Sequence, residues 1–219
     1  MMGVVELGTN APALWGKVTL IVMALLLVVF GVRFHAKQKP GAIGGPISAA
    51  KAFWLPFAIY FWFIVCGVLA VDDALPPALA MVYAAMALSM WLRGIAEMVM
   101  LYVTHNWRPP MGIAHDAFTI GVVLCVGGVA LGTSDVSSWS SLALGGAALL
   151  VVLVASLVLE IVHAWSFFLV VGKRTVGDDG IWFADDEDPR FKAINARTRI
   201  GNVVLGVPVF AYVVWWIVS

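Results

Sequence analysis

The chain has 219 residues, of which 62% are hydrophobic and 12% are charged, and its formal net charge is zero. A soluble domain carries about 25% charged residues, so a chain with a mean hydropathy of +0.98 must place most of its surface against lipid or other apolar helices. Nucleic-acid-binding domains are normally basic, so the balanced charge argues against that class of partner.

Six stretches are apolar enough to be membrane-spanning helices, which need roughly 20 apolar residues each. They cover approximately residues 15–34, 53–71, 77–104, 113–132, 142–172 and 200–218. In lipid, only helices and closed barrels satisfy every backbone polar group, and these runs are too continuous for barrel strands. The sequence therefore predicts a single all-α integral membrane domain over residues 1–219, built as a six-transmembrane-helix bundle that contacts membrane lipid.

Basic residues gather in the connectors that follow the first, third and fifth helices. Positively charged loops stay on the cytoplasmic side of a membrane, so these connectors are expected to be cytoplasmic and both termini non-cytoplasmic. We expect a multi-pass protein of a bacterial inner or plasma membrane. The residues concerned are eleven of the thirteen Lys and Arg: Arg33, Lys37, Lys39, Lys51, Arg108, Lys173, Arg174, Arg190, Lys192, Arg197 and Arg199.

Ionisable residues occur inside the third, fourth and fifth helices, where each costs on the order of 3 kcal/mol at the membrane centre. Helical spacing places all four histidines of the chain in the half near the cytoplasm. This asymmetry predicts a polar site in the cytoplasmic leaflet, built from these three helices. The candidates are Arg93, Glu97, Tyr102 and His105 of the third helix, His115 and Asp116 of the fourth, and Glu160, His163 and Trp165 of the fifth.

The long connector, residues 173–199, is expected to be cytoplasmic. It combines an acidic stretch with the apolar residues Ile181, Trp182 and Phe183, and then with the basic segment RFKAINARTRIGN. We interpret that segment as an interfacial helix held by anionic lipid. The alternative is a docking surface for a soluble redox partner or for another membrane subunit.

A metal centre is one interpretation of the polar site. Glu160 and His163 have the Glu-x-x-His spacing with which helical bundles hold iron or manganese, supplemented by carboxylates from facing helices. Glu97 and Asp116 would supply those carboxylates, His115 another nitrogen, and Arg93 would balance charge. Copper is a third candidate metal. Di-iron bundles carry two such pairs, and this chain has one.

Haem b or quinone chemistry is the second interpretation. A bis-histidine haem needs two imidazoles that face each other, and His163 with His115 or His105 would provide them. A quinone pocket needs one histidine or tyrosine, an acid and aromatic walls, for which Tyr102 and Trp165 are candidates. In either case the protein would be an oxidoreductase or the anchor subunit of an electron-transfer complex.

Two further interpretations use the same residues. The intramembrane charges would form a proton or ion relay in a transporter or channel, a role in which such residues recur. Alternatively, they would neutralise one another in a structural subunit. A bundle whose polar residues serve only to hold its helices together more often uses Ser, Thr and small residues. The sequence therefore favours a redox role over the transport and structural interpretations.

Overall fold

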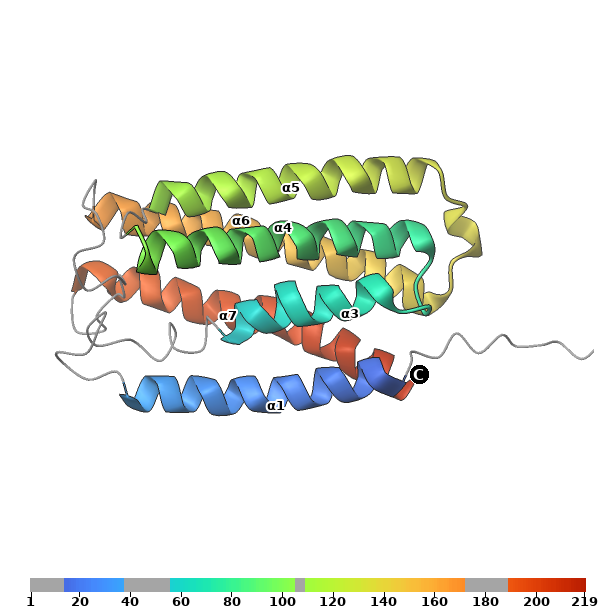
Figure 1. Cartoon of the computed structure of the whole chain (residues 1–219), viewed down its shortest axis with the longest axis horizontal. Coiled ribbons are helices and arrows are strands. Elements are labelled where there is room, and N and C mark those ends of the chain that lie inside the picture. Colours follow the sequence, from blue (N-terminus) through green and yellow to red (C-terminus); the bar gives the residue numbers. More distant parts are fainter. Residues whose placement is uncertain (1–13, 38–55, 105–108, 172–188) are drawn as a thin grey trace, which may run out of the picture.

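The computed structural model describes residues 14–37, 56–104, 109–171 and 189–219, and these residues form helices with no strand among them (Figure 1). The all-helical class expected from the sequence is confirmed. The elements are α1 (Leu14–Lys37), the π-helix η1 (Ile59–Val65), α3 (Cys66–Val71), α4 (Pro77–Tyr102), α5 (Pro109–Gly132), the 3₁₀-helix η2 (Val136–Ser138), α6 (Ser141–Val171) and α7 (Pro189–Val218).

Among the described residues, five helices are long and apolar enough to cross a membrane, which fits a multi-pass protein. They are Leu14–Arg33, Pro77–Met100, Pro110–Gly132, Ser141–Val170 and Lys192–Val218. The second apolar stretch forms a shorter helix, Pro56–Val71, and residues 53–55 of the expected span lie outside the described part of the chain. The basic segment expected at the interface is the beginning of α7, continuous with the last apolar stretch.

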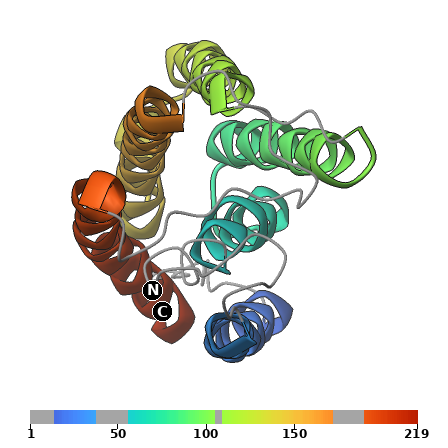
Figure 2. The ribbon, with the colours of Figure 1, turned by 90° about the vertical axis from the view of Figure 1, so that its left-hand side faces the viewer.

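The short helix occupies the middle of the bundle, between α1 and α4 (Figure 2). Its π-helical turn buries Tyr60, Phe61, Trp62 and Val65. An amphipathic α-helix normally buries one stripe of its surface, so three consecutive buried aromatic residues reflect this central position. The π-helical turn begins three residues after Pro56, which is the first described residue of this helix.

The other helices surround this centre so that neighbours in sequence are neighbours in space. Helix α4 packs against α5, α5 against α6, and α6 against α7, while α1 contacts both η1 and α7. The beginning of α1 and the C-terminal end of α7 lie at the same end of the bundle (Figure 1). We call this the termini end. The other end, where α1, α4 and α6 finish and α5 and α7 begin, is called the basic end.

Trp216, Tyr83 and Leu20, which are among the largest fully buried side chains, lie towards the termini end. Helix α1 lies at the edge, and most of its large apolar side chains are exposed. Such exposure is ordinary in lipid, because hydrocarbon tails are as apolar as a leucine side chain.

Candidate functional site

Four charged side chains from three helices meet in the half of the bundle near the basic end. Arg93 and Glu97 project from α4, Asp116 from α5 and Glu160 from α6. Arg93, Asp116 and Glu160 are 8%, 0% and 9% exposed. A rise of about 1.5 Å per residue places these three residues roughly 10–17 Å from the basic end of their helices. We call these four residues the charge cluster.

The guanidinium of Arg93 is at the centre of the cluster and contacts each of the three carboxylates. Its Nε donates to Glu97 Oε1 at 3.1 Å, and its Nη2 donates to Glu160 Oε1 at 2.7 Å. Its Nη1 donates to Asp116 Oδ1. The planar fork of arginine has five N–H donors in fixed directions, which allows one cation to bind acids on three helices.

The cluster holds more negative than positive charge. One guanidinium carries +1 and three ionised carboxylates would carry −3, which leaves a formal charge of −2. Asp116 Oδ2 is buried and has no hydrogen-bond partner among the described residues. An uncompensated buried charge costs several kcal/mol, whereas a protonated carboxylic acid is neutral. The arrangement therefore favours a cluster in which at least one carboxylate holds a proton.

The local sequence explains how these side chains come together. Arg93 and Glu97 are four residues apart and so share one face of α4. On α5, Gly112 lies one turn before Asp116. A Cβ atom at Gly112 would lie 3.5 Å from Arg93 Nη2 and 3.8 Å from Glu97 Oε1. Both distances are ordinary van der Waals contacts, so the backbone of α5 at Gly112 lies directly beside the guanidinium.

Hydroxyl groups continue the polar interior one turn deeper on all three helices. Ser89 of α4 and Thr119 of α5 share a hydrogen bond of 2.5 Å. Ser156 of α6 donates to the carbonyl of Leu153 at 2.6 Å and accepts from Trp62 Nε1 at 3.3 Å. Ser89 and Thr119 were not among the site residues expected from the sequence. Their spacing of four and three residues from Arg93 and Asp116 is the signal that would have found them.

His163 lies one turn from Glu160 on α6 but contacts a different helix. Its Nδ1 is 2.8 Å from the hydroxyl of Thr198 in α7, and that hydroxyl is 3.0 Å from the carbonyl of Ile194. A threonine hydroxyl has a single proton. If that proton goes to Ile194, the imidazole Nδ1 must donate to Thr198 Oγ1. Glu160 and His163 therefore take part in interactions at two different helix interfaces.

The remaining candidates are placed as follows. His115 is partly buried, and its Nδ1 lies 3.4 Å from Thr119 Oγ1 within α5. Trp165 is 52% exposed on the surface of the bundle, next to Phe168. Tyr102 is the last residue of α4. His105 lies outside the described residues, as do residues 38–55 and 172–188 with their basic, acidic and apolar side chains.

The position of Arg93 bears on whether the carboxylates of the charge cluster could bind a metal ion. Among the described residues, no group of three or more His, Cys, Asp or Glu side chains has an arrangement that could hold a metal ion. The guanidinium lies between the carboxylates that were expected to be ligands. A cation in that position repels a second one, so a metal would have to displace Arg93. The ligand roles of Glu97, Asp116, Glu160, His163 and His115 stay predictions.

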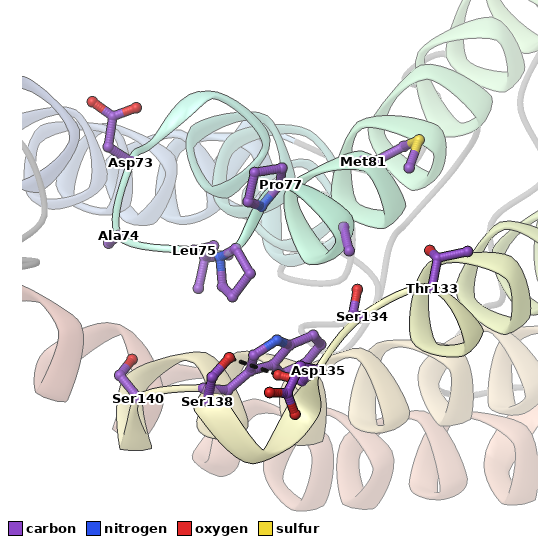
Figure 3. A pocket seen from close by; sticks show the side chains of 13 residues that line it. Asp73, Ala74, Leu75, Pro77, Met81, Thr133, Ser134, Asp135, Ser138 and Ser140 are labelled. Carbon is purple, nitrogen blue, oxygen red and sulfur yellow. Dashed lines mark hydrogen bonds between the residues drawn. The ribbon is translucent and has the colours of Figure 1, made fainter.

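A second feature is a groove at the termini end, with a volume of about 790 Å³ (Figure 3). Its walls are the connection between α3 and α4 and the connection between α5 and α6. Asp73, Asp135 and several hydroxyl side chains line it, together with Trp139. The groove is open to the surroundings and is separated along the helices from the charge cluster.

No family model matches the chain, and no curated protein or solved structure is significantly similar to it.

Proposed function

We propose that the chain crosses the membrane six times, with the basic end in the cytoplasm and both termini on the other side. Two observations support this. The beginning of α1 and the end of α7 lie at one end of the bundle, as expected for a chain with an even number of crossings (Figure 1). The basic residues Arg33, Lys192, Arg197 and Arg199 belong to the opposite helix ends, as expected for the cytoplasmic side. The inner or plasma membrane of a bacterium stays the expected location.

Within this topology, the protein moves protons across the membrane through the charge cluster. The observation that carries this proposal is the charge imbalance: one buried guanidinium contacts three carboxylates. Such a cluster is uncharged when two carboxylates are protonated and has a charge of −1 when one proton leaves. Arg93 holds both forms together, because its remaining ion pairs persist while a proton is bound or released.

A proton suits this site better than a larger cation. Sodium or calcium ions need several oxygen ligands around them; calcium takes six to eight. Arg93 already occupies the space between the carboxylates, and its charge would repel a metal ion. A proton needs a single oxygen atom, and Asp116 Oδ2 provides one that is buried and without a hydrogen-bond partner among the described residues. We assign Asp116 as the principal proton-binding group.

The test is proton flux into liposomes that contain the purified protein, driven by a potassium gradient with valinomycin and reported by an enclosed pH-sensitive dye. We expect wild-type flux well above that of empty liposomes. Asp116→Asn should abolish it, because an amide keeps the shape of the side chain but does not bind the proton. Asp73→Asn, which neutralises an exposed acid in the groove, is the matched control and should retain wild-type flux.

Wild-type flux no greater than that of empty liposomes would overturn the proposal. So would an Asp116→Asn variant that is folded and conducts protons at the wild-type rate.

The redox role expected from the sequence stays a prediction, and the same purified protein tests it. Stoichiometric iron, manganese or copper would support a metal centre. A Soret absorption band would support haem b. A bound quinone would be found by extraction into organic solvent.

A further inference from the structure

The half of the bundle near the termini end holds a second set of buried proton-carrying groups. Asp72, which follows α3, is 4% exposed although it adjoins a surface loop. Its Oδ1 accepts a hydrogen bond of 2.8 Å from the backbone N–H of Ala74. An exposed acid, Asp73, comes next in the chain and lines the groove. A buried carboxylate thus lies one residue from a solvent-accessible one.

Two buried tyrosines extend this set into the bundle. Asp72 lies beside the end of α7, because a Cβ atom at Gly16 would be 3.5 Å from Asp72 Oδ2 and 2.9 Å from Trp216 Cη2. Tyr212 is one turn before Trp216 on α7. Its hydroxyl donates to the carbonyl of Leu142 at 3.2 Å, and the hydroxyl of Tyr83 donates to the carbonyl of Gly146 at 2.7 Å. Both acceptors belong to the first turns of α6.

The two hydroxyl groups come together at Gly146. A Cβ atom at Gly146 would be 3.0 Å from the hydroxyl oxygen of Tyr212, and the carbonyl of this glycine accepts the bond from Tyr83. The absence of a side chain at Gly146 therefore lets the Tyr212 hydroxyl approach the α6 backbone where Tyr83 is bound.

We propose that Asp72, Tyr212 and Tyr83 form the extracytoplasmic branch of the proton path whose cytoplasmic branch is the charge cluster. This inference rests on the proposed function. Asp72 exchanges protons with water at the groove, and the tyrosine hydroxyls relay them. Each hydroxyl gives one proton and receives one, so the branch returns to its starting composition after each transfer.

An apolar layer separates the two branches. On α4, Met86 and Met90 are buried between Tyr83 and Arg93, and on α6 Leu149 and Leu153 are buried between Gly146 and Ser156. Hydrophobic constrictions of this kind control conduction by admitting or excluding water. Protons cross this layer only when water enters it. While the layer is dry, each branch is accessible from its own side of the membrane alone.

The experiment compares paired variants in the same liposome assay. Asp72→Asn removes the buried acid, and its neighbour Asp73→Asn is the control for charge and location. Tyr83→Phe removes one buried hydroxyl, and Tyr60→Phe is the control, because the Tyr60 hydroxyl also donates to a backbone carbonyl, that of Leu20 at 3.3 Å. Thermal unfolding of each variant in detergent identifies any that does not fold. The two pairs are independent, so either one tests the proposal.

We expect Asp72→Asn and Tyr83→Phe to lower proton flux about tenfold or more, since a positioned proton-transfer group contributes 10²–10⁴-fold to a rate. The control variants should stay within about twofold of the wild type. Asp72→Asn should also remove the dependence of flux on the pH of the compartment facing the termini end, while dependence on the pH at the basic end persists. A residue with a purely structural role would not change one dependence selectively.

The outcomes separate this inference from the proposed function. If Asp116→Asn blocks flux and the folded Asp72→Asn and Tyr83→Phe variants conduct at the wild-type rate, the extracytoplasmic branch is wrong and the proposed function stands. If wild-type liposomes conduct no protons, both are wrong.

Discussion

Replacement of Arg93 by methionine tests whether the charge cluster is a single interacting unit. Methionine keeps much of the length of the side chain but removes the cation that contacts Glu97, Asp116 and Glu160. Breaking a buried ion pair by removing one partner costs about 3–5 kcal/mol, because it leaves an uncompensated charge. Glu97 is partly exposed and its bond contributes less. The loss is therefore expected to come mainly from Asp116 and Glu160.

We expect Arg93→Met to lower the free energy of unfolding by about 3–5 kcal/mol. Asp116→Asn alone should change it little, since Arg93 keeps two carboxylates and the cluster becomes less negative. In the Arg93→Met background, however, Asp116→Asn should restore part of the stability, because an asparagine there neither carries an unpaired charge nor needs to take up a proton. The coupling in this double-mutant cycle should reach about 1–3 kcal/mol.

The measurement is unfolding in mixed detergent micelles with increasing SDS. The reporter is the reactivity of Cys66, which is fully buried in the folded protein. A Cys125→Ser background removes the other cysteine, which is exposed. If the effects of Arg93→Met and Asp116→Asn are additive within about 0.5 kcal/mol, the two side chains do not interact and the reasoning is refuted.

Two further predictions concern the interface between α6 and α7. Gly145→Val should lower stability by about 1–3 kcal/mol, because a Cβ atom there would lie 2.5 Å from Trp215 Cζ3; Gly128→Ala, which meets no atom within 4 Å, should be neutral. Equal stability of these two variants in the SDS assay would contradict the packing of α6 against α7. Thr198→Val should lower stability by about 1 kcal/mol through loss of the contact with His163. Thr198→Ser keeps the hydroxyl and should retain the contact with His163. A serine variant as unstable as the valine variant would show that this contact does not stabilise the protein.

The sequence predicted much of the charge cluster. Hydrophobic runs located the helices, and helical spacing with the positive-inside rule placed Arg93, Glu97, Asp116 and Glu160 in the half of the bundle near the cytoplasm. These side chains meet in the structure. Depth is predictable because it depends on counting residues from a helix end, and the ends are marked by polar connectors.

The direction of each side chain was less predictable. Glu160 and His163 were treated as one ligand pair because residues three apart share a helix face. At 3.6 residues per turn they differ in direction by about 60°. That angle is enough for Glu160 to contact Arg93 of α4 and for His163 to contact Thr198 of α7. The periodicity of one helix does not tell which helices pack beside it, because that depends on tertiary packing.

The π-helical turn of the second apolar stretch also lacked a sequence signal. Its run IYFWFIV is apolar throughout, so no polar residue reveals the helical period. The central place of this helix explains why every direction around it is apolar: it packs on α1 and α4 and, through the bond from Trp62 to Ser156, on α6.

The energetics of buried charges also bear on why the cluster exists. Replacing a buried ion pair by apolar side chains of similar volume is often neutral or stabilising, so Arg93 and its three acids are a poor way to hold α4, α5 and α6 together. The same helices already join through the Ser89–Thr119 hydrogen bond and through apolar contacts. A scaffold would need nothing more. A site that must hold a proton in one state and release it in another needs acids in excess of bases, away from water, and the charge cluster has this composition.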